Sequence, residues 1–306
     1  MKPLVSAVVV TYRSRDVIPR CVRSLARCRQ RFPFEAIVVD NASGDGTAEW
    51  IRQRAPWITL VENERNEGFT RAVNAGISRT HGSAVLLLNP DAEATPEGVE
   101  RLAGELRQDP CLAAAAPALA GPDFRTVRSC GRFPTLWTLA CDHLGLARAF
   151  PRTRLFGGYK YGDRPIASLC DVDWASGAAL LVSREALDRI GGLDEEIFMF
   201  MEEVDWCRRA RAAGLGVRYM PGVRFSHIGQ RSSAKAPIES YLHNVRARVH
   251  YFRKHHGAGG ALTARVLLAS SLALKLLAVA PRDPGRARTY ALALRAAWEP
   301  PRRMAS

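Results

Sequence analysis

The stretch Leu86-Leu87-Leu88-Asn89-Pro90-Asp91 joins an apolar run to a turn that carries one carboxylate. A short apolar run predicts a strand buried on both faces of a parallel sheet, and Asn-Pro-Asp predicts the point at which that strand ends. In open α/β sheets ligands bind outside the carboxyl ends of the strands, so Asp91 is well placed to hold a metal ion. Taken alone, these residues more often form a simple turn, and the rest of the chain decides between the two interpretations.

The chain on either side of this stretch alternates between apolar, β-branched runs and segments with helical periodicity. Strands are predicted at residues 6–12, 34–40, 58–61, 84–88 and 112–119, and helices at 16–31, 47–54, 66–80 and 96–108. This alternation predicts an α/β fold with a mostly parallel central sheet flanked by helices. Right-handed crossovers between parallel strands then bring Thr11, Asp40 and Asp91 to one edge of the sheet.

The second half of the chain is less regular. Residues 120–170 mix Gly, Pro, Arg and aromatic residues, which predicts a long insertion or a lid. Further on, a helix is predicted at 202–213, a strand at 216–220 and a basic helix at 241–256. Residues 261–280 are apolar, but their longest charge-free piece of about nine residues is short of the roughly 20 that a spanning helix needs. We therefore expect a core helix or one that lies on a membrane surface.

The composition, with 47% apolar and 24% charged residues, excludes a disordered chain. The net charge is +14, and residues 231–306 carry most of it, with 14 Lys and Arg against 3 Asp and Glu. Such a segment suits nucleic acid or an anionic membrane, and sparse aromatic residues favour the membrane, so no nucleic-acid partner is expected. The seven scattered cysteines argue against a disulfide framework and for a reducing compartment. A strand at the very N-terminus predicts no signal peptide.

Several polar residues at predicted element ends are candidates for chemistry. Asp40 could accept the imide N–H of uracil or thymine or a ribose hydroxyl, or it could simply hold a turn. The motif Glu202-Glu203-Val204-Asp205 opens a helix, where the macrodipole alone explains one or two acids. It follows an apolar run at 197–201, where burial could raise a carboxylate pKa to that of a general base. A lone His227 is more often structural, but with Asp91 it forms a candidate metal pair.

The ordered set of motifs resembles glycosyltransferase family 2, in its rhamnosyltransferase-like branch. The matching pieces occur in family order over residues 4–256: 8–12 (VVVTY), 38–47 (VVDNASGDGT), 66–69 (NEGF) with Asn74, 87–91 (LLNPD), 176–178 (SGA), 191–195 (GGLDE), 200–205 (FMEEVD) and 227–229 (HIG). The resemblance implies a GT-A fold, with a catalytic domain over residues 1–240 and a basic, helical C-terminal extension over 241–306 that could associate with a membrane.

The resemblance also implies a nucleoside-diphospho-sugar donor, linked to dTDP or UDP, and Mg²⁺ or Mn²⁺ as cofactor. Asp40 would hold the base and Thr11 the nucleoside. The implied donor-binding set is Thr11, Tyr12, Asp40, Asn41, Asn66, Gly68 and Asn89. Asp91 would be the metal carboxylate, on a shortened Asp-x-Asp motif, and His227 the second ligand.

For the acceptor side, the resemblance implies Glu203 as catalytic base, with Glu202 beside it and Trp174 in the acceptor wall. Relatives often have Glu-Asp where this chain has Glu202-Glu203, so the choice of base between the two stays open. Because the metal motif has one carboxylate, the predicted metal site depends on His227 reaching the same ion.

The predicted enzyme is an inverting glycosyltransferase that moves a sugar such as rhamnose to a hydroxyl of a glycan or lipid-linked glycan. It would work in the cytoplasm, bound peripherally to the inner face of the membrane. One alternative is a sugar-nucleotide pyrophosphorylase, which the missing phosphate loop after the first strand disfavours. A second is a catalytically inactive carbohydrate- or membrane-binding module, against which the intact Asp91, Glu203 and His227 count.

Overall fold

The computed structural model describes residues 4–123, 125–161, 166–229 and 236–299, and it divides the chain into two units. Unit 1 comprises Met1–Gly131, Ile166–Leu193 and Glu203–Ala234, and unit 2 comprises Arg132–Pro165, Asp194–Glu202 and Lys235–Ser306. The predicted boundary between a catalytic domain and a C-terminal extension, at residues 240 and 241, falls inside a helix of unit 2, Pro237–Val279. The division of function between these two parts stays a prediction.

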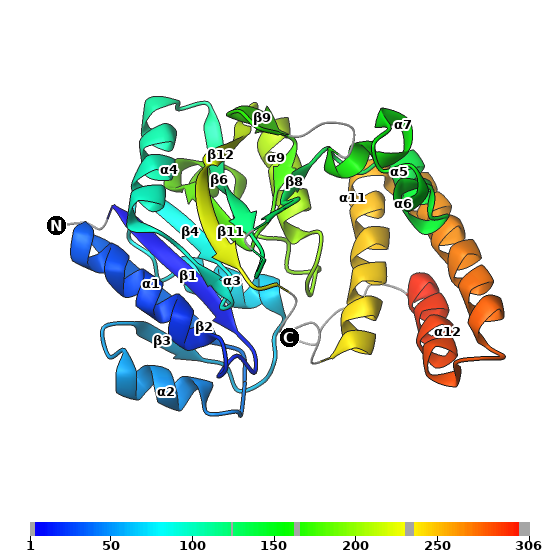
Figure 1. The fold of residues 1–306 in the computed structure, drawn as a ribbon, viewed down its shortest axis with the longest axis horizontal. Coiled ribbons are helices and arrows are strands. Elements are labelled where there is room, and N and C mark those ends of the chain that lie inside the picture. Colours follow the sequence, from blue (N-terminus) through cyan, green and yellow to red (C-terminus); the bar gives the residue numbers. More distant parts are fainter. Residues whose placement is uncertain (1–3, 124, 162–165, 230–235, 300–306) are drawn as a thin grey trace. The chain divides into compact units, whose positions relative to one another are not determined.

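Unit 1 is built on a mixed sheet in the order β3-β2-β1-β4-β11-β6-β12-β5 (Figure 1). Its strands are β1 (Val5–Thr11), β2 (Phe34–Asp40), β3 (Thr59–Glu62), β4 (Ala84–Leu88), β5 (Ala92–Glu93), β6 (Leu112–Ala120), β11 (Ala179–Ser183) and β12 (Gly216–His227), with β7 (Thr126–Val127) on β6 and β9 (Cys170–Val172) on β12. The strands β3, β2, β1 and β4 run parallel, as predicted, and Thr11 pairs in register with Asp40. The edge that carries Thr11, Asp40 and the end of β4 is therefore confirmed.

Helices cover both faces of this sheet. The helices of unit 1 are α1 (Ile18–Arg31), α2 (Thr47–Arg54), α3 (Phe69–Ile77), α4 (Pro96–Gln108), α8 (Arg184–Ile190) and α9 (Glu202–Ala212), whose first residue belongs to unit 2. Val9 of β1 shares one core cluster with Leu25 of α1 and Leu102 of α4. On the opposite face α3 approaches so closely that a side chain at Gly76 would collide with Val8. Burial on both faces explains the continuous β-branched runs.

The second half of the sheet contains two features that the sequence pattern did not predict. Strand β11 is antiparallel to both β4 and β6. Strand β12 does not end at Met220, because an irregularity between Met220 and Arg224 carries it past Pro221-Gly222 to His227. Such a bulge accommodates Pro221, which would otherwise end the ladder of hydrogen bonds. The short strands β8 (Cys130–Gly131) and β10 (Trp174–Ala175) pair with each other in a separate two-stranded sheet.

Unit 2 is helical (Figure 1). It contains α5 (Leu136–His143), α6 (Leu146–Ala149), α7 (Arg154–Gly157), the 3₁₀ turn η1 (Gly158–Lys160), α11 (Pro237–Val279) and α12 (Pro284–Trp298). Gly257 interrupts α11 with a positive φ of 70°, between the two helices predicted at 241–256 and 261–280. Helix α5 is fastened to α11, since Ser271 Oγ donates to the His143 carbonyl over 2.8 Å and Arg248 pairs with Asp142 at 3.1 Å.

The C-terminal half of α11 carries apolar residues on both its buried and its exposed sides. Ala264, Leu268 and Leu272 are buried, whereas other apolar residues of the same helix are exposed: Leu262, Val266, Leu274 and Leu277. Within the described residues, α11 alone is long and apolar enough to cross a membrane, and 22% of that window is buried. By length and composition α11 therefore passes as a spanning helix, contrary to the expectation that residues 261–280 fall short of one, and the segment is only in part a core helix.

The seven cysteines all lie in the described residues and are free thiols, as predicted. Burial raises the pKa of Cys28 to about 12, so this thiol stays protonated at neutral pH.

Candidate functional site

The ends of β1 and β2 meet through a buried hydrogen bond. Thr11 Oγ1 donates to Asp40 Oδ1 over 2.8 Å, and the Ser43 backbone N–H donates to Asp40 Oδ2 over 3.0 Å. The Ser43 hydroxyl also donates to Asp40 Oδ1. Asp40 thus stabilises the turn after β2, which was one of its two predicted roles. Its other predicted role, in binding a nucleobase, stays a prediction.

Asn41 joins the loop after β2 to the loop before α3. Its Nδ2 donates to Asn66 Oδ1 over 2.8 Å and to the Gly68 carbonyl over 3.1 Å. Its Oδ1 accepts from Asn63 Nδ2 at 2.9 Å and from the Glu67 N–H at 3.0 Å. Because Gly68 has a φ of 86°, this tight approach requires glycine. The structure therefore brings together Asn41, Asn66 and Gly68, which were predicted to line one pocket.

The loop after β1 is fastened to the same place. The Arg13 N–H donates to Ser43 Oγ over 2.9 Å, and the Arg13 guanidinium lies 5.3 Å from the ring centre of the half-buried Tyr12. Arg13 has a φ of 52°, unusual for a residue with a side chain. Tyr12 was among the predicted donor-binding residues, and the structure places the Arg13 cation beside it.

Asp91 and His227 come together because β5 pairs with the end of β12. His227 lies opposite Ala92 in this antiparallel pair, and the Ile228 N–H donates to the Asp91 carbonyl over 3.1 Å. Asp91 Oδ1 then lies 3.3 Å from His227 Nε2, and Asn89 Nδ2 lies 3.4 Å from the same nitrogen. Asp91 is only 8% exposed. The predicted metal pair, Asp91 and His227, and the predicted donor-binding residue Asn89 therefore form one cluster.

The chemistry of the Asp91–His227 pair suits a divalent cation. Two neighbouring ligands of an octahedral ion with bonds of about 2.1 Å lie about 3.0 Å apart. The observed 3.3 Å between Asp91 Oδ1 and His227 Nε2 is close to this value. Within the described residues no group of three or more His, Cys, Asp and Glu could hold a metal, so the protein would supply two ligands here. The remaining positions suit diphosphate oxygens and water.

A buried thiol lies under this cluster and does not compete for a cation. Cys21 Sγ lies 3.8 Å from the Asn89 carbonyl oxygen. Burial first, and then the negative charge of Asp91, raise the pKa of the Cys21 thiol well above its usual range. Since only the thiolate is a good metal ligand, Cys21 fills space here.

Helix α9 carries the acidic motif, and its three acids lie in different surroundings. Asp205 is fully buried and pairs with Arg209 at 2.9 Å. Glu203 is half-buried and lies beside Gly177, where an added side-chain carbon would be 3.6 Å from Glu203 Cβ. Glu202 is buried and follows Phe200 and Met201, both with positive φ. Asp205 is thus structural, and the choice of base remains between Glu202 and Glu203.

The loop between α8 and α9 is fastened by side chains whose role sequence analysis did not assign. Arg209 donates to the carbonyls of Ile190 and Gly192, at 2.9 and 2.6 Å. Asn74 of α3 donates to the Leu193 carbonyl over 2.9 Å and accepts from its N–H over 2.8 Å. The same loop therefore ties α9, which carries Glu203, to α3, which begins at the Asn66–Gly68 turn. Asn74 and Asp205 both belong to the matching family motifs, but the motifs do not indicate that Asn74 binds Leu193 or that Asp205 binds Arg209.

Trp174 lies in β10, which pairs with β8, and it is 4% exposed. Its predicted place in an acceptor wall stays a prediction.

Several known proteins that are similar to this chain in sequence are glycosyltransferases. The sequence profile described as glycosyl transferase family 2 matches residues 6–180. The chain is 29% identical over 286 residues to the N-acetylglucosaminyl-diphospho-decaprenol L-rhamnosyltransferase of Mycobacterium tuberculosis, covering 90% of this chain and 92% of that protein. It is 26% identical over 216 residues to the low-salt glycan biosynthesis hexosyltransferase Agl10 of Haloferax volcanii, covering 69% and 63%.

Solved structures show the same fold. The mannosyltransferase PcManGT from Pyrobaculum calidifontis, in complex with GDP-Man and Mn²⁺, matches with a TM-score of 0.52 and 19% identity over 97% of this chain and 86% of that one. GalNAc-T7 with UDP, GalNAc and Mn²⁺ matches with a TM-score of 0.57 and 16% identity over 81% and 48%.

Proposed function

The chain belongs to glycosyl transferase family 2 and has the GT-A fold predicted from its sequence, and from this premise we propose that it is an inverting, metal-assisted sugar transferase. The donor is a nucleoside-diphospho-sugar, and the acceptor is a hydroxyl of a glycan or lipid-linked glycan. The observation that carries the proposal is the 3.3 Å approach of Asp91 Oδ1 to His227 Nε2. Family membership as a glycosyltransferase excludes the pyrophosphorylase alternative, and the intact pair disfavours an inactive module.

The donor nucleoside occupies the edge formed by β1 and β2. Thr11 and Asp40 hold its base and ribose, and the loops joined through Asn41 close around it. A uridine or thymidine nucleotide fits a carboxylate acceptor for the imide N–H. Relatives crystallised with UDP or GDP-Man support a nucleotide sugar, and the mycobacterial relative is a rhamnosyltransferase, which supports rhamnose as the sugar.

The diphosphate leaving group lies over Asn89 and Asp91. Asp91 Oδ1 and His227 Nε2 would hold Mg²⁺ or Mn²⁺, which supplies the positive charge that stabilises the departing diphosphate. Two solved structures with similar folds contain Mn²⁺, which supports this ion. Asn89 Nδ2 lies 3.4 Å from His227 Nε2, so the Asn89 amide lies beside the two proposed ligands and can donate a hydrogen bond to a diphosphate oxygen.

The acceptor hydroxyl attacks the anomeric carbon on the face opposite the leaving group. Glu203 accepts the proton that the hydroxyl loses, and the bond from the anomeric carbon to the donor phosphate oxygen breaks as the new glycosidic bond forms. One displacement inverts the anomeric centre. The half-buried position of Glu203 supports its assignment as base, with Glu202 as the competing residue.

An anionic membrane surface is the proposed site of work, on the cytoplasmic face. The exposed apolar residues of α11 and the charge of residues 231–306 support it, and so does a relative named for a decaprenol-linked acceptor. Helices α5 to α7 add further exposed apolar side chains to unit 2: Trp137, Leu144, Phe150 and Leu155.

Calorimetric titration with nucleoside diphosphates in the presence of Mn²⁺ tests the proposed function. Metal-dependent binding of dTDP or UDP, followed by turnover of the matching nucleotide sugar, is the expected result. If no nucleoside diphosphate binds with or without Mn²⁺, the proposal is wrong.

A further inference from the structure

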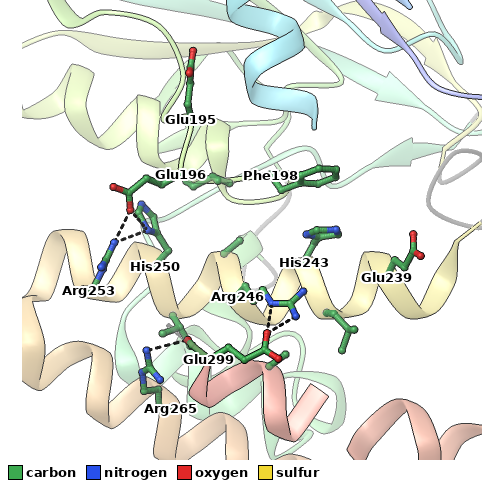
Figure 2. A pocket seen from close by; sticks show the side chains of 15 residues that line it. Glu195, Glu196, Phe198, Glu239, His243, Arg246, His250, Arg253, Arg265 and Glu299 are labelled. Atoms are coloured by element: carbon green, nitrogen blue, oxygen red, sulfur yellow. Dashed lines mark hydrogen bonds and ion pairs between the residues drawn. The ribbon is translucent and has the colours of Figure 1, made fainter. Parts of the chain in front are cut away.

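A cavity of about 430 Å³ lies entirely within unit 2 and takes no part in the site described above. Its walls come from residues 195–198, from both halves of α11 and from the end of α12 with Glu299 after it (Figure 2). Cavities of this size hold small organic ligands, with an apolar lining and a few convergent polar groups.

The cavity has an aromatic wall. Phe198 and His243 stack with ring centres 4.1 Å apart and an angle of 11° between their planes, and both side chains are only half-buried (Figure 2). Ile197, Leu242 and Ala247 extend the apolar lining. Such a surface suits the apolar face of a ring-shaped ligand.

Paired charges surround this wall. Arg246 contacts Glu299 at 2.6 Å, and Arg253 contacts Glu196 at 2.7 Å (Figure 2). Guanidinium groups donate hydrogen bonds and carboxylates accept them, so a ligand with several hydroxyl groups finds both kinds of partner.

The charge balance selects the class of ligand. The lining contains three arginines and four glutamates, so it is close to neutral: Arg246, Arg253, Arg265, Glu195, Glu196, Glu239 and Glu299. A diphosphate would meet four carboxylates there, which disfavours an anionic ligand. A neutral polyhydroxylated ligand pays no such electrostatic penalty.

The segment that forms the cavity is held in place. Asp194 accepts from His250 Nε2 at 2.9 Å and from Lys254 Nζ at 2.7 Å. The hydrogen bond from His250, together with Lys254, holds the pKa of Asp194 well below its usual range despite partial burial. The ionised carboxylate of Asp194 therefore holds the adjacent residues 195–198 against α11.

We propose that this cavity, with Phe198 and His243 as its platform, is a subsite of unit 2 that binds a sugar ring of the glycan substrate. The proposal rests on the proposed function, because that function supplies the glycan as the ligand. Phe198 binds the apolar face of a sugar ring, and the arginine–glutamate pairs bind its hydroxyls.

Saturation-transfer NMR with the methyl glycosides of N-acetylglucosamine, rhamnose, mannose and galactose tests the subsite on the full chain. The variants are Phe198→Ala and, as a matched control, Phe150→Ala, which removes an exposed aromatic ring of unit 2 that does not line the cavity. Mn²⁺-dependent binding of UDP and dTDP is measured by calorimetry on the same samples.

We expect at least one glycoside to bind the wild-type chain, with affinity reduced about tenfold or more in Phe198→Ala and unchanged in Phe150→Ala. Mn²⁺-dependent binding of the nucleoside diphosphate should be equal in all three proteins. If no glycoside binds, or if Phe198→Ala binds glycoside as the wild type does, the subsite is refuted while nucleoside diphosphate binding still supports the transferase. If the wild type binds no nucleoside diphosphate, the proposed function fails, whichever glycosides bind. Misfolding of Phe198→Ala would appear as altered nucleoside diphosphate binding, and Phe198→Leu, which keeps much of the volume but not the ring, then decides with the same expected loss.

Discussion

Asp91 Oδ1 lies 3.3 Å from His227 Nε2, although the two residues lie far apart in the chain. The short strand β5 makes this approach possible, because it turns the chain after Asp91 back along the end of β12. A carboxylate and an imidazole held at this spacing, at the edge that also carries Thr11 and Asp40, form the basis of the proposed transferase.

Replacing Asp91 should remove metal-dependent activity. Asp91→Asn keeps the shape but loses the charge, so we expect Mn²⁺ affinity in the presence of nucleoside diphosphate to fall about tenfold to hundredfold and turnover to fall with it. Titration of activity against Mn²⁺ measures both. Asp188→Asn, which alters an exposed acid on α8, is the control and should behave as the wild type. Full activity of Asp91→Asn in excess chelator would show that the metal assignment is wrong.

The two candidate bases can be separated by kinetics. Glu203→Gln should lower kcat about a hundredfold to ten-thousandfold, with donor affinity unchanged, because only proton removal is lost. Glu202→Gln should have a smaller effect on kcat. The reverse ranking of the two variants in steady-state kinetics would transfer the role of base to Glu202.

The third acid of the motif should affect folding stability. Asp205 is fully buried on Arg209, so Asp205→Ala leaves a largely buried guanidinium without its partner and should lower the free energy of unfolding by about 3–5 kcal/mol. Chemical denaturation measures this loss. A stable Asp205→Ala protein that has lost only kcat would mean that Asp205 acts in catalysis.

His143 predicts a dependence of stability on pH. Burial, and then the charges of Arg248 and Lys275, lower the pKa of His143 from 6.5 to about 4. Between these two pH values the histidine binds a proton more readily in the unfolded chain than in the folded one. The contribution of His143 to the free energy of unfolding is therefore fully present above pH 6.5 and is lost as the pH drops toward 4, by a few kcal/mol at most. Urea denaturation across this range should show a flatter profile for His143→Gln. Equal slopes in both proteins would contradict the assignment.

The exposed apolar residues of α11 should control membrane binding. Leu274→Glu with Leu277→Glu puts two charges where we expect acyl chains, so binding to anionic vesicles should fall at least about tenfold in a flotation assay. The double variant Gln30→Glu with Gln53→Glu makes the same change in charge on exposed positions of unit 1 and should bind normally. Equal vesicle binding by both double variants would refute the membrane surface.

The parallel half of the fold was predictable because its strands are buried on both faces and leave continuous apolar runs. The same runs place Thr11, Asp40 and Asp91 at one edge, which the structure confirms. The reversed direction of β11 leaves no comparable signal, because a buried strand reads alike in either direction. Likewise Pro221-Gly222 indicates the end of a strand, whereas the observed irregularity lets β12 continue to His227.

Within the site, residue types were predictable and partners were not. Asn41 was predicted to bind donor, and the structure shows that its amide atoms hold two loops together. The attachment of Asn74 to Leu193 and of Arg209 to Gly192 depends on contacts between distant segments, which no local pattern encodes. The choice of catalytic base between Glu202 and Glu203 could not be made from the sequence, because two adjacent glutamates differ only in their surroundings.

Electron spin-echo spectroscopy of Mn²⁺ bound to the protein with dTDP or UDP tests the proposed Asp91–His227 metal site most directly. We expect modulation from one imidazole nitrogen in the wild type and its loss in His227→Gln. Protein-bound Mn²⁺ without any imidazole coupling in the wild type, or with an unchanged coupling in His227→Gln, would contradict it.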